Sequence, residues 1–168
     1  MPIRLRRDFL ALATRLRVPI IEDDMYRGLH FSAAPPPSLH SLDTQSVVIY
    51  LSGFSKVLAP GLRLGYLSAA KPIVEQLGII KQRADLHTQN LAQYVVADLI
   101  EDGTFDAYLA QVRTEHRRRR DALAAALERH GAASFFRFGI PDGGLYFWCR
   151  LGGRLLAASV FAKALEES

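Results

Sequence analysis

One stretch of this 168-residue chain gathers side chains suited to chemistry on a carbonyl compound and an anion. Residues 52–66 read Ser-Gly-Phe-Ser-Lys-Val-Leu-Ala-Pro-Gly-Leu-Arg-Leu-Gly-Tyr, with a single lysine, Lys56, and a single arginine, Arg63. A lysine near other cations, or held as an imine, is useful for carbonyl chemistry. The planar fork of an arginine suits phosphate, and the hydroxyls of Ser52 and Ser55 with loop amides can complete a phosphate cradle. The same spacing also fits an ordinary basic hairpin loop, so the pattern alone leaves both interpretations open.

A second stretch is the acidic run Glu22, Asp23 and Asp24, which directly follows an apolar run. Open α/β sheets bind ligands beyond the carboxyl ends of their strands. A carboxylate of Asp23 at that point can pair with a protonated ring nitrogen, and the phenol of Tyr26 can turn to the same place. The plainer interpretation of the acidic run is the start of a polar loop, and we favour it for Glu22 and Asp24. The plainer interpretation of Tyr26 is a half-buried packing residue.

Three apolar runs, residues 18–21, 47–51 and 64–69, predict the sheet that positions both stretches. The first is typical of a buried parallel strand. The third should return antiparallel to the second, because too few residues lie between them for a helical crossover. Lys56 and Arg63 are then expected on one loop at one end of the sheet.

Helical periodicity predicts the elements around this sheet. Leu5, Phe9, Leu12 and Leu16 form the apolar stripe of a first helix, and residues 27–46, with three consecutive prolines, are expected to form a surface connection. Further helices are expected from Pro72, from about Leu91, from Thr104 to Gly131, and from about Arg154 to the end. Residues 134–138 and 145–151 predict two strands joined by a turn, with Cys149 in the core and Trp148 packed on the opposite face. The fold class is therefore α/β, ending in the start of a smaller α+β unit.

Composition narrows the class of protein. Hydrophobic residues make up 49% of the chain, enough for a sizeable core, and the net charge of +4 suits an anionic ligand without implying nucleic acid or membrane. A single cysteine rules out an internal disulfide and favours a reducing compartment. No apolar run is long enough to span a membrane, no signal peptide is recognisable, and the histidines lack metal-ligand spacing. We expect a cytoplasmic protein without a metal site.

In combination, the two stretches resemble the fold-type I enzymes that depend on pyridoxal 5'-phosphate (PLP), in particular class I/II aminotransferases of the 2-aminoadipate-like branch. The likeness covers essentially the whole chain; the segment from Phe54 to Gly65 is highly specific, and Pro141 to Trp148 is moderately specific. It implies an aspartate aminotransferase-like fold with a mixed, mostly parallel sheet. Residues 1–115 would be part of the PLP-binding large domain, and residues 116–168 a linking helix and the start of the small domain.

The resemblance also assigns roles to individual residues. It makes Lys56 the catalytic residue that holds PLP as a Schiff base, with Asp23 on the pyridinium nitrogen. Tyr26 would donate a hydrogen bond to the phenolic oxygen of the ring, while Arg63 and Ser55 would bind the phosphate.

The chain departs from the family pattern in two ways. Relatives read Gly-Ser-Phe-Ser-Lys, whereas this chain reads Ser52-Gly53-Phe-Ser-Lys. Either a backbone amide at Gly53 or the hydroxyl of Ser52 replaces the usual phosphate contact, or that contact is lost. The family's earlier phosphate loop, the aromatic residue that stacks on the ring and the late arginine that grips the substrate carboxylate are not found. We therefore expect an internal fragment of a larger protein, whose complete form the resemblance implies to be a homodimer.

The expected function is transfer of an amino group between an amino acid and a 2-oxo acid. One alternative is a PLP-binding, effector-sensing domain of a MocR/GntR-type transcriptional regulator, which would bind DNA only through a winged-helix domain upstream. Another alternative is an inactive fragment, so activity of the 168-residue chain by itself stays open.

Overall fold

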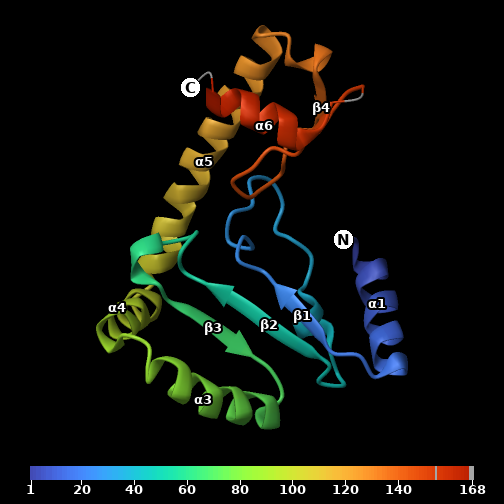
Figure 1. Ribbon diagram of the computed structural model, residues 1–168. Helices are drawn as coiled ribbons and strands as arrows, with labels where there is room; N and C mark the ends of the chain where they lie inside the picture. The colour runs from blue at the N-terminus through green and yellow to red at the C-terminus, as the bar shows by residue number, and fades with distance from the viewer. Residues whose placement is uncertain (154, 167–168) are drawn as a thin grey trace.

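The first sheet has the three strands and the directions that the apolar runs predict (Figure 1). Its strands are β1 (Ile20–Asp23), β2 (Val48–Gly53) and β3 (Gly65–Ser68), in that order. β1 runs parallel to β2, with Ile20 opposite Val48, and β3 returns antiparallel to β2. The carboxyl ends of β1 and β2 are therefore neighbours, and the chain leaves each of them into one of the two stretches singled out above.

The expected long helices are present in the computed structural model, which describes residues 1–153 and 155–166. They are α1 (Ile3–Leu16), α3 (Lys71–Asp85), α4 (Asn90–Glu101), α5 (Thr104–Arg129) and α6 (Ala157–Glu166). The predicted start of the last helix at Arg154, and its predicted end, lie outside the described residues. The short helix α2 (Leu39–Leu42) and the 3-10 turns η1 (Pro60–Leu62) and η2 (Ala132–Ser134) are not evident from periodicity. Within the described ranges, no helix has the length and apolar character needed to cross a membrane.

Two hydrophobic clusters hold the first sheet to its helices. One joins α1, α2 and the sheet and contains Leu10, Ala13, Ile20, Leu39 and Val48. The other joins the loops after β1 and β2 to α5 and contains Leu29, Val57 and Leu109. The prediction of a surface connection over residues 27–46 is therefore wrong in part, because Leu29 is fully buried and Phe31 nearly so.

The apolar stripe predicted for α1 is not the face that packs. Leu5 and Leu16 are more than half exposed, at 53% and 59%, while Leu10 and Ala13 make the contact with the sheet. An unpaired apolar stripe is costly in water, at roughly 25 cal/mol for each Å² left exposed. The periodicity thus identifies the helix but not its partner.

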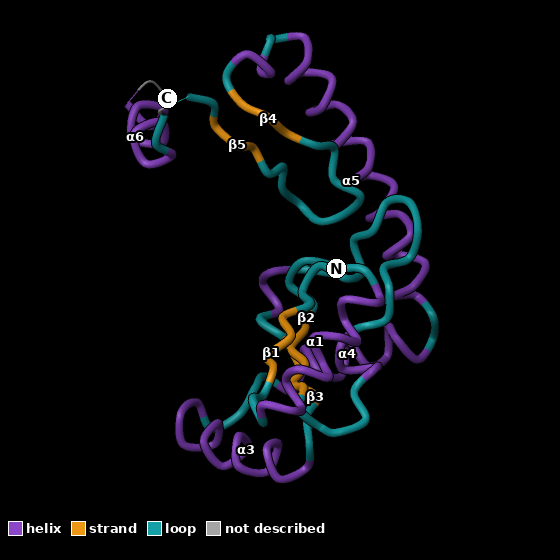
Figure 2. The backbone as a smooth tube through the Cα atoms, turned by 90° about the vertical axis from the view of Figure 1, so that its right-hand side faces the viewer, coloured by secondary structure: helices purple, strands orange, loops and turns teal. Residues whose placement is uncertain are grey.

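A second sheet lies at the far end of α5 from the first (Figures 1 and 2). β4 (Phe136–Phe138) and β5 (Cys149–Leu151) pair antiparallel, as expected, although both are shorter than predicted. Cys149 is exposed and Trp148 is 82% exposed, so the prediction that both are packed is wrong. The loop between the strands is long and runs back toward the loop that follows β1 (Figure 1).

Candidate functional site

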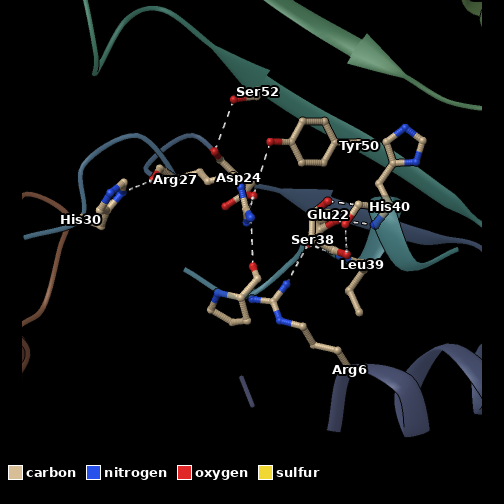
Figure 3. A network of polar contacts seen from close by, with 12 residues as sticks. Arg6, Glu22, Asp24, Arg27, His30, Ser38, Leu39, His40, Tyr50 and Ser52 are labelled. Carbon is tan, nitrogen blue, oxygen red and sulfur yellow. Dashed lines mark hydrogen bonds and ion pairs between the residues drawn. The ribbon is translucent and has the colours of Figure 1, made fainter. Parts of the chain in front are cut away.

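The three consecutive acidic residues take different roles because side chains alternate along β1. Glu22 lies on the face toward α1 and α2 (Figure 3). Its carboxylate accepts hydrogen bonds from the backbone N–H groups of Leu39 and His40, at 2.8 and 2.9 Å, and pairs with Arg6 at 3.3 Å. Glu22 therefore joins α1, β1 and α2, which is a structural role.

Asp24 lies on the same face as Glu22 and is also bound within the fold (Figure 3). Its carboxylate accepts from Arg27 at 3.2 Å and from the hydroxyl of Tyr50 at 3.4 Å. Burial raises the pKa of Tyr50 to about 12, and the charge of Asp24 adds to the effect, so that this phenol stays protonated and donates. Asp24 is thus occupied in holding β1 to β2.

Asp23 is the carboxylate that remains available. It is exposed on the opposite face of β1, and within the described part of the chain it forms no hydrogen bond or ion pair through its side chain. The charge of Asp23 acts on the phenol of Tyr26. A hydrogen bond with Tyr146, burial and the charges of Tyr146 and Asp23 raise the pKa of Tyr26, so its phenol is a proton donor at neutral pH.

Lys56 and Ser55 stand on the turn directly after β2, and both are half-buried. They line a cavity of about 540 Å³ between this turn and α5, which also includes Tyr108 and Leu145. Among the described residues, Lys56 has no carboxylate in ion-pair range. An amine that lines a cavity and has no paired acid among the described residues is placed to react with a bound carbonyl compound.

Arg63 ends the same loop in a strained conformation. It follows the η1 turn with φ 50° and ψ 33°, in the left-handed region that non-glycine residues seldom adopt. Its guanidinium is exposed, and among the described residues it donates to the carbonyl of Pro60 alone, at 3.4 Å. Residues held in such conformations cluster at ligand sites, where the surrounding structure pays the cost of about 1–2 kcal/mol.

Ser52 lies apart from the other sequence-predicted residues. It is on the face of Asp24, and its hydroxyl donates to the backbone carbonyl of Asp24 at 3.3 Å. The structure therefore brings Asp23 and Tyr26 together at the end of β1, and Ser55, Lys56 and Arg63 onto the loop after β2. The hydroxyl of Ser52 instead ties the ends of those two strands to each other.

Gly53 is closely surrounded, so we expect Gly53→Ser to destabilise the protein by about 1–3 kcal/mol. A Cβ atom at this position would lie 3.0 Å from the backbone oxygen of Leu64 and 3.1 Å from the Cα atom of Gly65. Urea unfolding should show the loss, with Gly61→Ser as the control, because a Cβ atom at Gly61 meets no atom within 4 Å. Equal stability of the two variants would contradict the conclusion that the close surroundings of Gly53 exclude a side chain at this position.

Sequence reasoning missed two arginines that connect α5 to the site. Arg113 donates to the carbonyl of Gly28 at 2.7 Å, and Arg120 donates to the carbonyl of Pro141 at 3.0 Å. Their separation of seven residues places both on one side of α5. This spacing could have indicated a shared role, but Arg120 is the last of four consecutive arginines, which look like a solvated stretch of helix. In the described ranges, no group of three or more potential ligands gathers as a metal site.

Comparison with known proteins finds relatives of two kinds, aminotransferases and HTH-type transcriptional regulators. The family model for aminotransferase class I and II matches residues 4–168. The chain is 38% identical over 99% of its length to the 2-aminoadipate transaminase of Thermus thermophilus, of which it covers 42%. It is 35% identical over 96% of its length to the uncharacterised HTH-type transcriptional regulator YisV of Bacillus subtilis, of which it covers 33%.

Solved structures of the same kind superpose closely on this fold. The crystal structure of LysN, the α-aminoadipate aminotransferase of Thermus thermophilus, matches with a TM-score of 0.89 and 38% identity, over 99% of this chain and 43% of that one. The kynurenine aminotransferase of Pyrococcus horikoshii matches with a TM-score of 0.90 and 30% identity, over 99% and 41%. The chain thus spans about a third to two-fifths of the length of the relatives it matches.

Proposed function

Because the chain belongs to the class I and II aminotransferase family, we propose that it carries the PLP site of an aminotransferase acting on an amino acid and a 2-oxo acid. One observation carries the proposal. Two complementary groups of side chains lie at the neighbouring carboxyl ends of β1 and β2: the carboxylate of Asp23, which has no side-chain partner among the described residues, with Tyr26, and the Lys56 loop. Ligands of open α/β sheets bind at this edge.

The donor set fits PLP group by group. The carboxylate of Asp23 suits a protonated ring nitrogen, and the protonated phenol of Tyr26 suits the phenolic oxygen of the ring. The Lys56 amine suits the aldehyde, and the Arg63 guanidinium with the Ser55 hydroxyl suits the phosphate. Each of these side chains is thus matched to a part of PLP that it can pair with by charge, hydrogen bonding or covalent bonding.

Each residue then has a defined task. Asp23 keeps the proton on the ring nitrogen, and PLP, when bound, withdraws electrons from the α-carbon of the substrate. Lys56 first holds the cofactor and, once released from it, moves the proton at the substrate α-carbon. Arg63 and Ser55 anchor the phosphate, and Ser52 supports the site by tying β1 to β2.

Arg63→Gly should separate ligand binding from folding. Glycine relieves the left-handed strain, so the free energy of unfolding should stay equal or rise by about 1 kcal/mol. Loss of the guanidinium removes charged hydrogen bonds to the phosphate, so the Kd for PLP should rise roughly 10- to 100-fold. Arg17→Gly is the matched control, since Arg17 has φ 55° at the end of α1, away from the site. The same Kd in both variants would exclude Arg63 from the cradle.

The function is tested by amino-group transfer in the complete protein that contains this chain. The purified protein with PLP is assayed against a panel of amino acids that includes 2-aminoadipate, leucine, kynurenine and the aromatic amino acids, each with a 2-oxo acid acceptor. We expect turnover that depends on PLP and on Lys56. Absence of transfer across the panel, with PLP bound, would exclude the enzyme and leave the regulator or an inactive protein.

A specific observation favours a second candidate. Several relatives of similar identity, among them YisV, YdfD and NorG, are HTH-type transcriptional regulators. In that case residues 1–168 would sense an effector through bound PLP within a DNA-binding protein. DNA affinity that changes with PLP or an amino acid, in a complete protein without turnover, would support this function over the enzyme.

We also propose the finer features that the resemblance implies. Residues 1–115 belong to the large domain and residues 116–168 to the linking helix and the start of the small domain, so that α5 crosses the boundary. A cytoplasmic homodimer is the proposed form of the complete protein. The exposed apolar residues of α1 and α3, such as Leu5, Leu16 and Ile80, support association through further protein surface.

A further inference from the structure

A short clasp joins the loop after β1 to the loop between β4 and β5. His30 and Gly143 form an antiparallel bridge, in which the N–H of Phe31 donates to Asp142 and the N–H of Gly144 donates to Leu29, each at 2.8 Å. The two segments lie more than a hundred residues apart in the sequence but meet between the two sheets (Figure 1). We call residues 29–32 and 141–144 the clasp.

The clasp depends on Gly143. A Cβ atom there would lie 2.5 Å from the carbonyl oxygen of Leu29 and 3.2 Å from the Cα atom of His30. Both neighbours are backbone atoms, and Leu29 is fully buried, so they have little room to move. Any larger residue at 143 must open the bridge.

Side chains fix the clasp at both ends. Ser32 donates to the carboxylate of Asp142 at 3.2 Å. Arg120, with only 14% of its side chain exposed, donates to the carbonyl of Pro141 at 3.0 Å and places its guanidinium 5.1 Å from the ring centre of Phe31. A cation over an aromatic face in a shielded place adds stability. The clasp is therefore attached to α5 as well as to itself.

The clasp brings Tyr146 to Tyr26. Tyr146 follows the clasp by two residues, and its ring meets that of Tyr26 edge to face, with centroids 6.1 Å apart and an angle of 78° between the planes. Hydrogen bonding with Tyr146 is also the largest cause of the raised pKa of Tyr26. Both rings line one cavity of about 720 Å³ together with Asp142 and Gly144.

We infer that Tyr146 is a positioning residue for Tyr26, held in place by the clasp, and that its ring holds the Tyr26 ring where the Tyr26 hydroxyl can bind the phenolic oxygen of PLP. The inference rests on the PLP function proposed above. An edge-to-face ring contact sets the plane of the Tyr26 ring and so the place of its hydroxyl group. Tyr146 acts through Tyr26 and is not itself assigned a contact with the cofactor.

The test is a double-mutant cycle on PLP affinity, measured by equilibrium titration of the cofactor-free complete protein. Tyr26→Phe and Tyr146→Ala should each raise the Kd for PLP, by roughly three- to tenfold, the equivalent of one hydrogen bond. If Tyr146 acts through Tyr26, the second substitution should add nothing in the Tyr26→Phe background. Tyr94→Phe, on an exposed side of α4, is the control and should leave the Kd unchanged. Independent effects that multiply in the double variant would overturn the inference.

A second measurement needs no PLP. Ultraviolet titration of phenolate formation in the cofactor-free protein should show that Tyr146→Ala lowers the pKa of one remaining tyrosine, whereas Tyr94→Phe, which also removes one phenol, does not. Gly143→Ala should lower the same pKa by opening the clasp. An unchanged titration in Tyr146→Ala would overturn the inference. If wild-type protein binds no PLP while the titration behaves as expected, the PLP function fails and the pairing of Tyr146 with Tyr26 stands.

Discussion

Lys56→Ala should abolish covalent retention of PLP. Borohydride reduction of the wild-type complete protein should fix the cofactor to the peptide that contains Lys56, as found by peptide mass, and reduction of the variant should fix it to none. Turnover should fall by at least roughly 10²–10⁴-fold, the share usually supplied by a positioned acid or base, because no other amine lies on the loop to move the α-proton. The fold should persist, since Lys56 forms no ion pair among the described residues.

Lys71→Ala is the matched control. Lys71 begins α3, its side chain is 86% exposed, and in the described part of the chain it pairs with Glu75 at 3.8 Å. The variant should retain both the label and the turnover. Label recovered on Lys71 or Lys81 in the wild-type protein would contradict the assignment of Lys56.

The sheet and the long helices follow from local patterns. Apolar runs of four to six residues identify β1, β2 and β3, and the short connection before β3 requires an antiparallel return. Proline at the start of α3 and glycine after α5 are equally local signals. These features were predictable because neighbouring residues determine them.

Packing partners are not determined locally. The stripe on α1 predicts a buried face, yet Leu5 and Leu16 are exposed, because periodicity cannot tell whether a partner surface is present. The prediction that Trp148 and Cys149 are packed is wrong for a related reason, since β5 belongs to a two-stranded sheet that leaves these side chains exposed. Leu29, within a segment rich in turn residues, is buried through contacts with α5 that no local pattern indicates.

The candidate site was predicted as a set of residue types, and the structure adds where each of these residues lies. Sequence favoured Asp23 over Glu22 and Asp24, and the structure supplies the reason: the other two carboxylates are occupied by backbone amides, Arg27 and Tyr50. The clasp was beyond sequence reasoning. Its two halves are distant in the chain, and its bonds are mostly between backbone atoms, which leave no side-chain signature.

Asp23→Asn should reduce turnover by roughly 10²–10³-fold, the usual cost of removing one group that stabilises charge in the transition state. A neutral amide cannot hold the proton on the ring nitrogen, so the bound cofactor should withdraw electrons less well. PLP content should change little, because Lys56, Arg63 and Ser55 are untouched. Since Asp23 is exposed and makes no contact that holds the described residues together, thermal unfolding should match wild type. Steady-state kinetics and cofactor absorbance on the same preparation measure both quantities.

Asp24→Asn is the internal control, one residue away on the other face of β1. Its carboxylate accepts from Arg27 and Tyr50, so the variant should lose about 1 kcal/mol of stability while keeping turnover within about threefold. The two variants should therefore differ in what they lose: Asp23→Asn loses turnover, whereas Asp24→Asn loses stability. Equal loss of turnover in both would mean that the side chains of β1 alternate in the opposite sense at the site, and that Asp23 is not the residue that faces the ring nitrogen.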